Sequence, residues 1–300
     1  MNRFQLLIKA VNPVSLLIGV SSVIGGTAAA TGFGRPNFLT ALFCLIFAVS
    51  GQIAATLMGR YLGVKNNYPR NDTDVLEKYS FEPLAGVLKE GMEAFTLLAA
   101  TAGLFLLAVS GWWTIVVAIM LAMLVYAVNV GSNPLTRNPF YLAVSFLIYG
   151  PIAVFGTAFT QESVNSNILM CLGNDGAEFM ISGIMGLQAV NIHLVCSLWE
   201  NKMYKECPPH TFLVRFGKNV TIVFYIMNSL VISALMAATP LVSPLAVTWW
   251  WFMLSGIVLC ANLSIAVLAL KKPAAWMERA SIFIMLSISL IYLVVYLIEC

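Results

Sequence analysis

Charged side chains are scarce in this chain, and aspartate is the scarcest of them. Only 10% of the 300 residues are Asp, Glu, Lys or Arg, whereas a soluble domain carries about a quarter. The three aspartates are Asp72, Asp74 and Asp175, and none of them lies at the end of a long apolar run. The composition therefore excludes an ordinary soluble domain, and it leaves any site inside a membrane short of aspartate.

Cysteine pairs and metal-binding spacings are also missing. The six cysteines are scattered along the chain, and no CxxC or Cys/His spacing occurs among them. This pattern argues against a zinc site and against a disulfide framework. The net charge of +3 comes from basic residues between apolar runs, so it does not indicate a surface for nucleic acid.

The chain is instead rich in long apolar runs. Hydrophobic residues make up 60% of it, and the mean hydropathy is +0.88. A helix of roughly 20 apolar residues crosses a bilayer core of about 30 Å. The fold class that we predict is therefore an all-α, polytopic membrane bundle in a single domain, residues 1–300. We place its nine transmembrane helices at about 13–34, 38–62, 93–111, 113–131, 140–158, 178–199, 219–239, 246–270 and 277–298.

The basic residues predict the orientation of this bundle. With a cytoplasmic N-terminus, 15 of the 16 Lys and Arg residues fall on the cytoplasmic side, and only Arg35 falls outside. This positive-inside bias places the C-terminus on the outer side. Two long segments, at about 63–91 and 199–218, also fall on the cytoplasmic side. Because long ordered loops are usually functional, we expect a site for a charged ligand to face the cytoplasm.

Several polar residues fall inside the predicted helices, where such residues usually face the interior of a bundle and point to a site. For each one taken alone, we favour a hydrogen bond between helices. His193 has no partner at a metal-ligand spacing, so a ligand role is the alternative interpretation for it. The set is Gln52, Glu93, Asn129, Gln188, Asn191, His193, Asn228 and Asn262.

Four segments carry a resemblance to a known family. The second predicted helix ends in SGQIAATLMGRYLG, the long segment after it contains FEPLAG, the fifth helix contains YGPIAVFGTAFTQ, and the sixth continues into VCSLWENKMYKECPPHTFLVRFG. In this order and spacing they resemble the UbiA-type intramembrane prenyltransferases, most closely the branch that prenylates 1,4-dihydroxy-2-naphthoate in menaquinone biosynthesis. The resemblance covers most of residues 8–220. It implies nine helices around a central cavity, in a bacterial inner membrane.

The resemblance also implies two Asp-rich motifs, at the cytoplasmic ends of the second and sixth helices. Their carboxylates hold Mg²⁺, which bridges the diphosphate of a prenyl donor and neutralises it as it leaves. At the positions of the first motif this chain has Thr56, Gly59, Arg60 and Gly63, and at those of the second it has Cys196, Ser197, Glu200 and Tyr204. One acid of the set survives, as Glu200. We therefore predict no metal site and assign no catalytic residue.

Two further hypotheses concern the charges near these degenerate motifs. Arg60 and Glu200 form an ion pair that occupies the place of the metal. Alternatively, basic side chains hold a diphosphate directly, since Arg pairs well with phosphate oxygens. The possible phosphate or head-group contacts are Arg60, Lys65, Arg70, Lys205 and Arg215. Asp72 and Asp74 could supply acids, but a solvated loop is the simpler interpretation of them.

Three functions follow from these observations. The first is a catalytically degenerate homologue, a pseudoenzyme that binds an isoprenoid or quinone or serves as a structural subunit of a membrane complex, with no cofactor. The second is an active Mg²⁺-dependent prenyltransferase that moves a prenyl chain onto an aromatic quinone precursor. The third, a transporter or channel, ranks last because charges in the middle of the predicted helices are essentially absent. Membrane lipid is a partner in each case, and nucleic acid is not.

Overall fold

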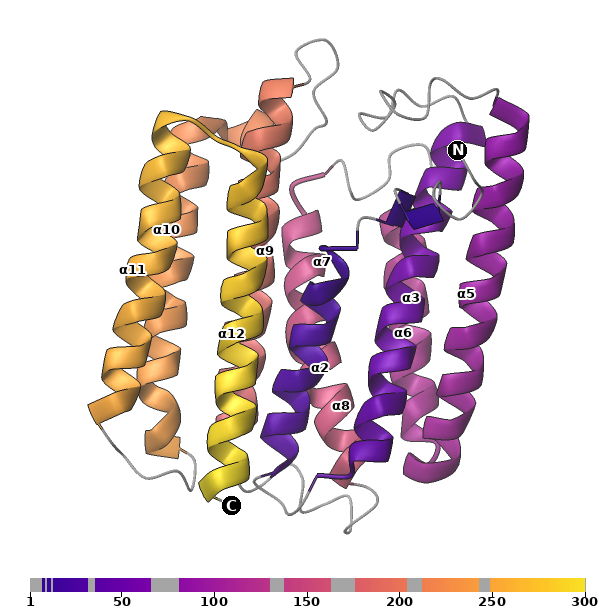
Figure 1. Cartoon of the computed structure of the whole chain (residues 1–300), viewed down its shortest axis with the longest axis horizontal. Helices are drawn as coiled ribbons and strands as arrows, with labels where there is room; N and C mark the ends of the chain where they lie inside the picture. The colour runs from indigo at the N-terminus through magenta and orange to yellow at the C-terminus, as the bar shows by residue number, and fades with distance from the viewer. Residues whose placement is uncertain are drawn as a thin grey trace.

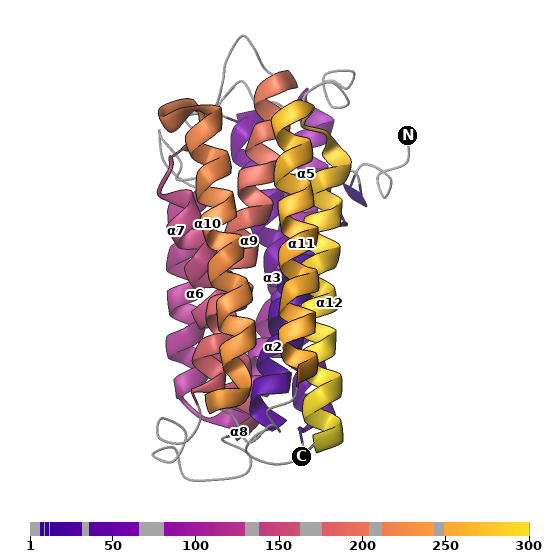
Figure 2. The same cartoon turned by 90° about the vertical axis from the view of Figure 1, so that its left-hand side faces the viewer.

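In the computed structural model the described residues are 7–8, 10–11, 13–31, 36–65, 81–129, 138–162, 176–203, 212–242 and 249–299. They form a bundle of helices that run roughly along one direction (Figures 1 and 2). The elements are α2 (Leu16–Thr31), α3 (Phe38–Lys65), α5 (Phe81–Ser110), α6 (Trp113–Asn129), α7 (Tyr141–Leu147), the π-helix η2 (Ile148–Ile152), α8 (Ala153–Glu162), α9 (Ala177–Met203), α10 (Phe212–Val242), α11 (Trp249–Lys271) and α12 (Ala275–Glu299).

The predicted fold class is confirmed. Within the described residues, seven helices are long and apolar enough to cross a membrane, and α2 and α6 are shorter apolar helices. The fifth predicted span is a single rod in which α7, η2 and α8 follow one another without a break. The chain is thus an integral membrane protein, and each predicted span has a helical counterpart.

One predicted boundary is wrong, because the first long segment is partly helical. Helix α5 begins at Phe81 rather than near 93. Helix α10 begins at Phe212, but its backbone is non-helical at Gly217, where φ is +82°, so the continuous helix starts close to the predicted residue 219. The extension of α5 is amphipathic: Val87 and Leu88 are buried, while Lys89 is exposed. Pro83 lies in its first turn, where a missing backbone N–H leaves no hydrogen bond unmade. The hydrophobicity of a span therefore marks only the part of the helix inside the bilayer.

Helix α2 lies between two groups of helices (Figure 1). It contacts α9 and α12 on one side and α3 on the other, and it also packs against α8. Small residues make these contacts close: a Cβ at Gly26 would lie 2.6 Å from the carbonyl oxygen of Val154. In lipid the hydrophobic effect does not drive helices together, so small residues and van der Waals contact are what hold such a bundle.

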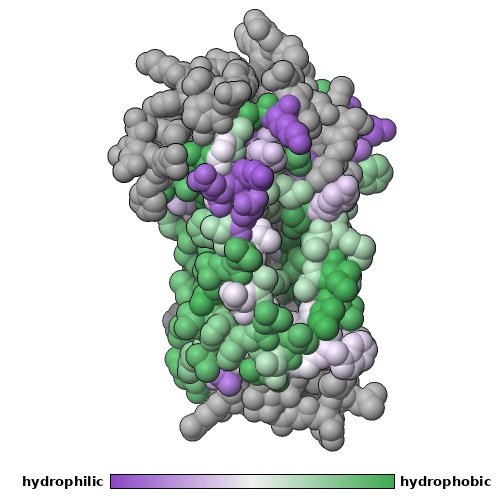
Figure 3. All heavy atoms as spheres, turned by 90° about the vertical axis from the view of Figure 1, so that its right-hand side faces the viewer, coloured by the Kyte–Doolittle hydropathy of each residue, from purple (hydrophilic) through white to green (hydrophobic). Residues whose placement is uncertain are grey.

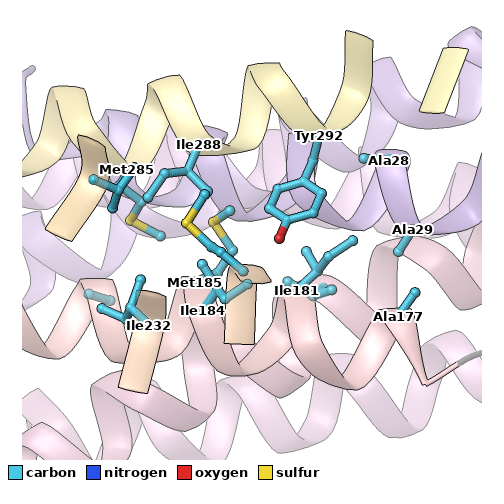
Figure 4. Close-up of a cluster of buried hydrophobic side chains, with 14 of the residues drawn as sticks. Ala28, Ala29, Ala177, Ile181, Ile184, Met185, Ile232, Met285, Ile288 and Tyr292 are labelled. Carbon is cyan, nitrogen blue, oxygen red and sulfur yellow. The ribbon is translucent and has the colours of Figure 1, made fainter. Parts of the chain in front are cut away.

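The largest core lies where α9 faces α12 and α2. Figure 4 shows Ile288 and Tyr292 of α12 directed toward Ile181 and Ile184 of α9. All four side chains are essentially inaccessible to solvent. Smaller buried clusters lie elsewhere in the bundle, and many large apolar side chains are exposed on its outside. Figure 3 shows a hydrophobic surface over the middle of one face, with hydrophilic side chains toward one end.

A hydrogen-bonded network of buried polar side chains joins α9 to α12. The Gln188 Nε2 amide donates to Asn262 Oδ1 at 3.4 Å and to the Ser281 carbonyl oxygen at 3.3 Å. The Tyr225 hydroxyl donates to the same Asn262 Oδ1 at 3.0 Å. Asn191 Nδ2 donates to the Ser229 hydroxyl at 3.1 Å. The expectation of interhelical hydrogen bonds is confirmed for Gln188, Asn191 and Asn262.

The rod formed by α7, η2 and α8 approaches α9 through two glycines. A Cβ at Gly150 would lie 2.7 Å from the Ser182 carbonyl oxygen and 2.9 Å from Gly186 Cα. Pro151 follows directly, inside the π-helix. Proline lacks an N–H and collides with the carbonyl of the preceding turn, and a π-bulge is one way to relieve this.

We expect Gly150→Ala to destabilise the bundle by about 1–3 kcal/mol, because the added methyl group collides with the backbone of α9. The midpoint of thermal or SDS-induced unfolding in detergent measures the effect. Gly256→Ala is the matched control, since a Cβ there meets nothing within 4 Å. Equal stability of the two variants would show that the contact is looser than described.

We expect Asn262→Leu to cost about 1–2 kcal/mol, because it removes the Oδ1 acceptor of the Gln188 amide and the Tyr225 hydroxyl and the donor to Gln188 Oε1. Ser264→Ala on the same helix is the control, since the exposed Ser264 hydroxyl bonds only to the Cys260 carbonyl of its own helix. The same unfolding assay compares the two, and a loss no larger than that of the control would argue against the network.

Candidate functional site

One end of the bundle carries the basic side chains. We call it the basic end and define it by Arg60 and Lys65 of α3, Arg215 of α10, Lys271 of α11 and Arg279 of α12. Helices α3 and α9 end there, and α5, α10 and α12 begin there (Figure 1). The positions of both degenerate motifs therefore lie at this end.

The last turns of α3 hold the first motif. The Thr56 hydroxyl donates to the Gln52 backbone carbonyl at 2.8 Å, so it is occupied within its own helix. The Gln52 Nε2 amide donates to the Ser15 carbonyl at 2.9 Å and ties α3 to the start of α2. Arg60, half-buried, stands one turn after Thr56. This end of α3 thus presents a cation and a hydroxyl that is already bonded.

The last turns of α9 hold the second motif. The Ser197 hydroxyl donates to the Leu194 carbonyl of the same helix at 2.8 Å. The neighbouring Cys196 hydrogen bonds to the Glu278 side chain of α12. Glu200 lies on α9, but its side chain, like the whole of Tyr204, is outside the described part of the structure. The Arg60–Glu200 ion pair therefore stays a prediction.

Glu278 is a carboxylate that our sequence analysis missed. It lies in the first turn of α12, half-buried, next to the exposed Arg279. No motif singles it out, because its importance comes from the contact with Cys196 on a helix 82 positions earlier in the chain. An acid at the start of an apolar helix was the available signal. The structure thus adds one carboxylate to the second motif from a different helix.

The predicted phosphate contacts are divided between the two groups of helices. Arg60 and Lys65 lie on α3, which packs against α5 and α2, whereas Arg215 lies on α10, which packs against α9 and α11. The Arg215 guanidinium lies 5.7 Å from the centre of the Phe216 ring, just before the backbone turns at Gly217, where φ is +82°. Arg70 and Lys205 lie outside the described residues.

The described side chains at the two motif ends do not fit Mg²⁺. This ion prefers hard oxygen ligands in octahedral geometry, usually carboxylates, but Thr56 and Ser197 offer neutral hydroxyls and Arg60 is a cation. Across the described ranges, no three His, Cys, Asp or Glu side chains lie together in a group that could hold a metal ion. Asp72 and Asp74 are outside those ranges.

His193 lies on α9, one turn before Cys196. Its imidazole makes an edge-on contact with the Tyr141 ring of α7, with 4.9 Å between ring centres, and a tilted one with the Tyr149 ring of η2 at 6.4 Å. The Nε2 atom is buried and has no hydrogen-bond partner. The simple structural interpretation, a hydrogen bond between helices, is therefore not met at this atom.

Comparison with known proteins identifies solved structures that have a similar fold. No protein-family model and no curated protein matches the chain. A UbiA homologue from Archaeoglobus fulgidus bound to GPP and Mg²⁺ is similar at a TM-score of 0.63 with 12% identity, over 97% of this chain and 99% of the other. The same homologue bound to DMAPP and Mg²⁺ is similar at 0.62, also with 12% identity, over 97% and 98%.

A third solved structure comes from work on digeranylgeranylglyceryl phosphate synthase in membranes. It matches at a TM-score of 0.57 with 13% identity, over 100% of this chain and 99% of the other. The resemblance predicted for most of residues 8–220 thus extends in three dimensions over almost the whole chain, including α10, α11 and α12. The assignment to the 1,4-dihydroxy-2-naphthoate branch stays a prediction. This chain has the fold of the UbiA-type intramembrane prenyltransferases.

Proposed function

We propose that this protein binds an isoprenoid lipid, a quinone in particular, inside a UbiA-type bundle and does not transfer the prenyl chain. The proposal rests on the side chains in the last turns of α3 and α9, where the two motif positions lie. The hydroxyls of Thr56 and Ser197 bond to their own helices, and Arg60 stands where the resemblance implies an acid. Binding needs an apolar interior, whereas transfer needs the departing diphosphate to be neutralised.

Charge is the reason for separating binding from transfer. A metal-bridged diphosphate is stabilised by several kcal/mol as negative charge develops on it. At the α3 end the chain presents a positive side chain, Arg60, which repels Mg²⁺ and attracts phosphate. Arginine can hold a diphosphate through charge-assisted hydrogen bonds. It carries a single positive charge, however, and so neutralises less of the charge on the leaving diphosphate than a divalent ion does. The site therefore favours a bound lipid over a broken C–O bond.

The solved structures support room for such a ligand. Two of the similar structures are of a homologue bound to GPP or DMAPP together with Mg²⁺. They have the fold of this chain, so an isoprenyl chain is compatible with the bundle. In this protein we infer that the isoprenyl chain of the ligand enters between the two groups of helices that flank α2, and that the polar head group of the ligand lies toward the basic end.

The second candidate is an active Mg²⁺-dependent prenyltransferase with a rearranged site. One observation favours it: Glu278 brings a carboxylate to the second motif from α12. Together with Glu200, and with the acids of residues 66–80, it could complete a different ligand set. Two separate tests, of transfer and of binding, distinguish the candidates.

We expect the purified protein to form no prenylated product from geranyl diphosphate and 1,4-dihydroxy-2-naphthoate in the presence of Mg²⁺. We also expect it to bind a prenylated quinone with an affinity that EDTA leaves unchanged, because no ion bridges the ligand to the protein. Chromatography of the extracted lipids and titration in detergent measure the two quantities. A product that appears with Mg²⁺ and disappears with EDTA would establish the transferase instead.

We expect Arg60→Gln to weaken binding of geranyl diphosphate about tenfold, since a hydrogen bond to a charged group contributes about 1.5–3 kcal/mol. Binding of geraniol, which has no phosphate, should not change. Lys271→Gln is the matched control, because Lys271 is an exposed cation at the end of α11, in the other group of helices. Equal losses for geranyl diphosphate and geraniol would assign Arg60 a structural role.

A further inference from the structure

The contact between α9 and the α7–η2 rod contains an unusual combination of side chains. His193 projects from α9 toward Tyr141 of α7 and Tyr149 of η2, and Figure 1 shows these helices side by side. His193 as a residue is half-buried, and its Nε2 atom is inaccessible to solvent. Within the described part of the chain, this nitrogen has no hydrogen-bond partner.

This arrangement is built into the backbone. Gly150 and Gly186 let the rod approach α9 to within direct backbone contact. The π-helix at Ile148–Ile152 widens the rod at the same level and carries Tyr149. Single-turn π-bulges inside α-helices are often found at functional sites. The position of Tyr149 beside His193 is thus fixed by two close contacts and an irregular turn, rather than by a mobile loop.

Another polar side chain on α9 shows what a purely structural role looks like. Gln188 is fully buried, and its Nε2 amide donates hydrogen bonds to α11 and α12. It points into the helix group that α9 belongs to. His193, by contrast, faces the rod and meets aromatic rings instead of acceptors. A buried polar atom without a partner is unfavourable, so a ligand that hydrogen bonds to His193 Nε2 would remove that cost.

The chemistry of the three side chains selects the ligand. An uncharged imidazole nitrogen donates to a carbonyl or accepts from a hydroxyl, and a tyrosine hydroxyl can do both. The tyrosine rings offer flat apolar faces on which another ring can pack, at centroid separations of 4.5–7 Å as is general for aromatic pairs. The cations that suit a phosphate lie elsewhere: His193 is ten residues before Met203, the last residue of α9, which is about 15 Å along a helix.

We propose that His193, Tyr141 and Tyr149 form the binding site for the ring of a quinone or hydroquinone, with the His193 Nε2 atom hydrogen bonded to a ring oxygen. The inference rests on the proposed binding function and assigns the head group to a place within it. The carbonyl of the oxidised ring accepts from the imidazole, and the hydroxyl of the reduced ring donates to it. The ring lies against Tyr149, and its prenyl tail continues into the apolar interior.

Binding of a 1,4-naphthoquinone with one prenyl unit tests this site, with geraniol as the ligand that has no ring. We expect His193→Phe, which keeps a ring but removes the nitrogens, to weaken naphthoquinone binding at least tenfold and to leave geraniol binding unchanged. His193→Gln, which restores a donor and an acceptor, should recover most of the affinity. Wild-type affinity in His193→Phe, or an equal loss for geraniol, would overturn the proposal.

A control variant separates the site from general effects on packing. Tyr292→Phe removes a buried hydroxyl that is hydrogen bonded to Thr239 at 2.9 Å, in the core between α10 and α12. We expect this variant to bind the naphthoquinone as the wild type does, whereas Tyr149→Phe should bind it more weakly. If Tyr292→Phe loses as much affinity as Tyr149→Phe, the effect belongs to the bundle and not to this site.

A measurement on the wild-type protein avoids variants that fail to fold. The chain has two histidines, His193 and His210. We expect the naphthoquinone to shift the ¹⁵N NMR resonance of His193 Nε2 and to leave the resonances of His210 unchanged, in protein labelled with [¹⁵N]histidine. An unshifted His193 resonance in protein that binds the quinone would overturn the site but not the binding function. Mg²⁺-dependent transfer would overturn the proposed function whatever His193 does.

Discussion

Packing of α9 against its neighbours is the constraint on which the rest of the bundle depends. Helix α9 contacts α10, α12, α2 and the α7–η2 rod, and 67% of its apolar window is buried, against 28% for α3 and 11% for α5. Lipid gives no hydrophobic driving force between helices, so such a centre must be held by close contact and hydrogen bonds. Gly186 supplies the contact, and Gln188 and Asn191 supply the hydrogen bonds.

The basic end depends on this packing without contributing much to it. Cys196 and Ser197 are placed by the last turns of α9, whose preceding turns are fixed in the core. At the same end, Lys218 Nζ donates to the Leu270 carbonyl at 2.6 Å and satisfies an acceptor at the end of α11. Lys218 therefore caps a helix end. The basic end thus has a structural role in addition to the topological one that the sequence predicts for its basic residues.

Sequence patterns predicted the helices well because a bilayer imposes a length and a composition on each span. They failed in the first turns of α5, since the amphipathic extension there has the composition of a polar loop. The motif positions at the ends of α3 and α9 came from the resemblance. The Cys196–Glu278 and His193–Tyr141 contacts did not, because they depend on how α9 is rotated against α12 and α7. In a helix that is apolar on most sides, periodicity does not fix that rotation.

The packing of the bundle does not depend on the side chains at the two motif positions. Helix-end carboxylates take no part in the contacts of Gly26, Gly150 or Gly186, nor in the network around Asn262. A change of charge at those positions would therefore leave the packing of α9 intact. The His193 Nε2 atom is one of several buried polar atoms without a hydrogen-bond partner among the described residues. The proposed ring site centres on it because its imidazole also faces the rings of Tyr141 and Tyr149.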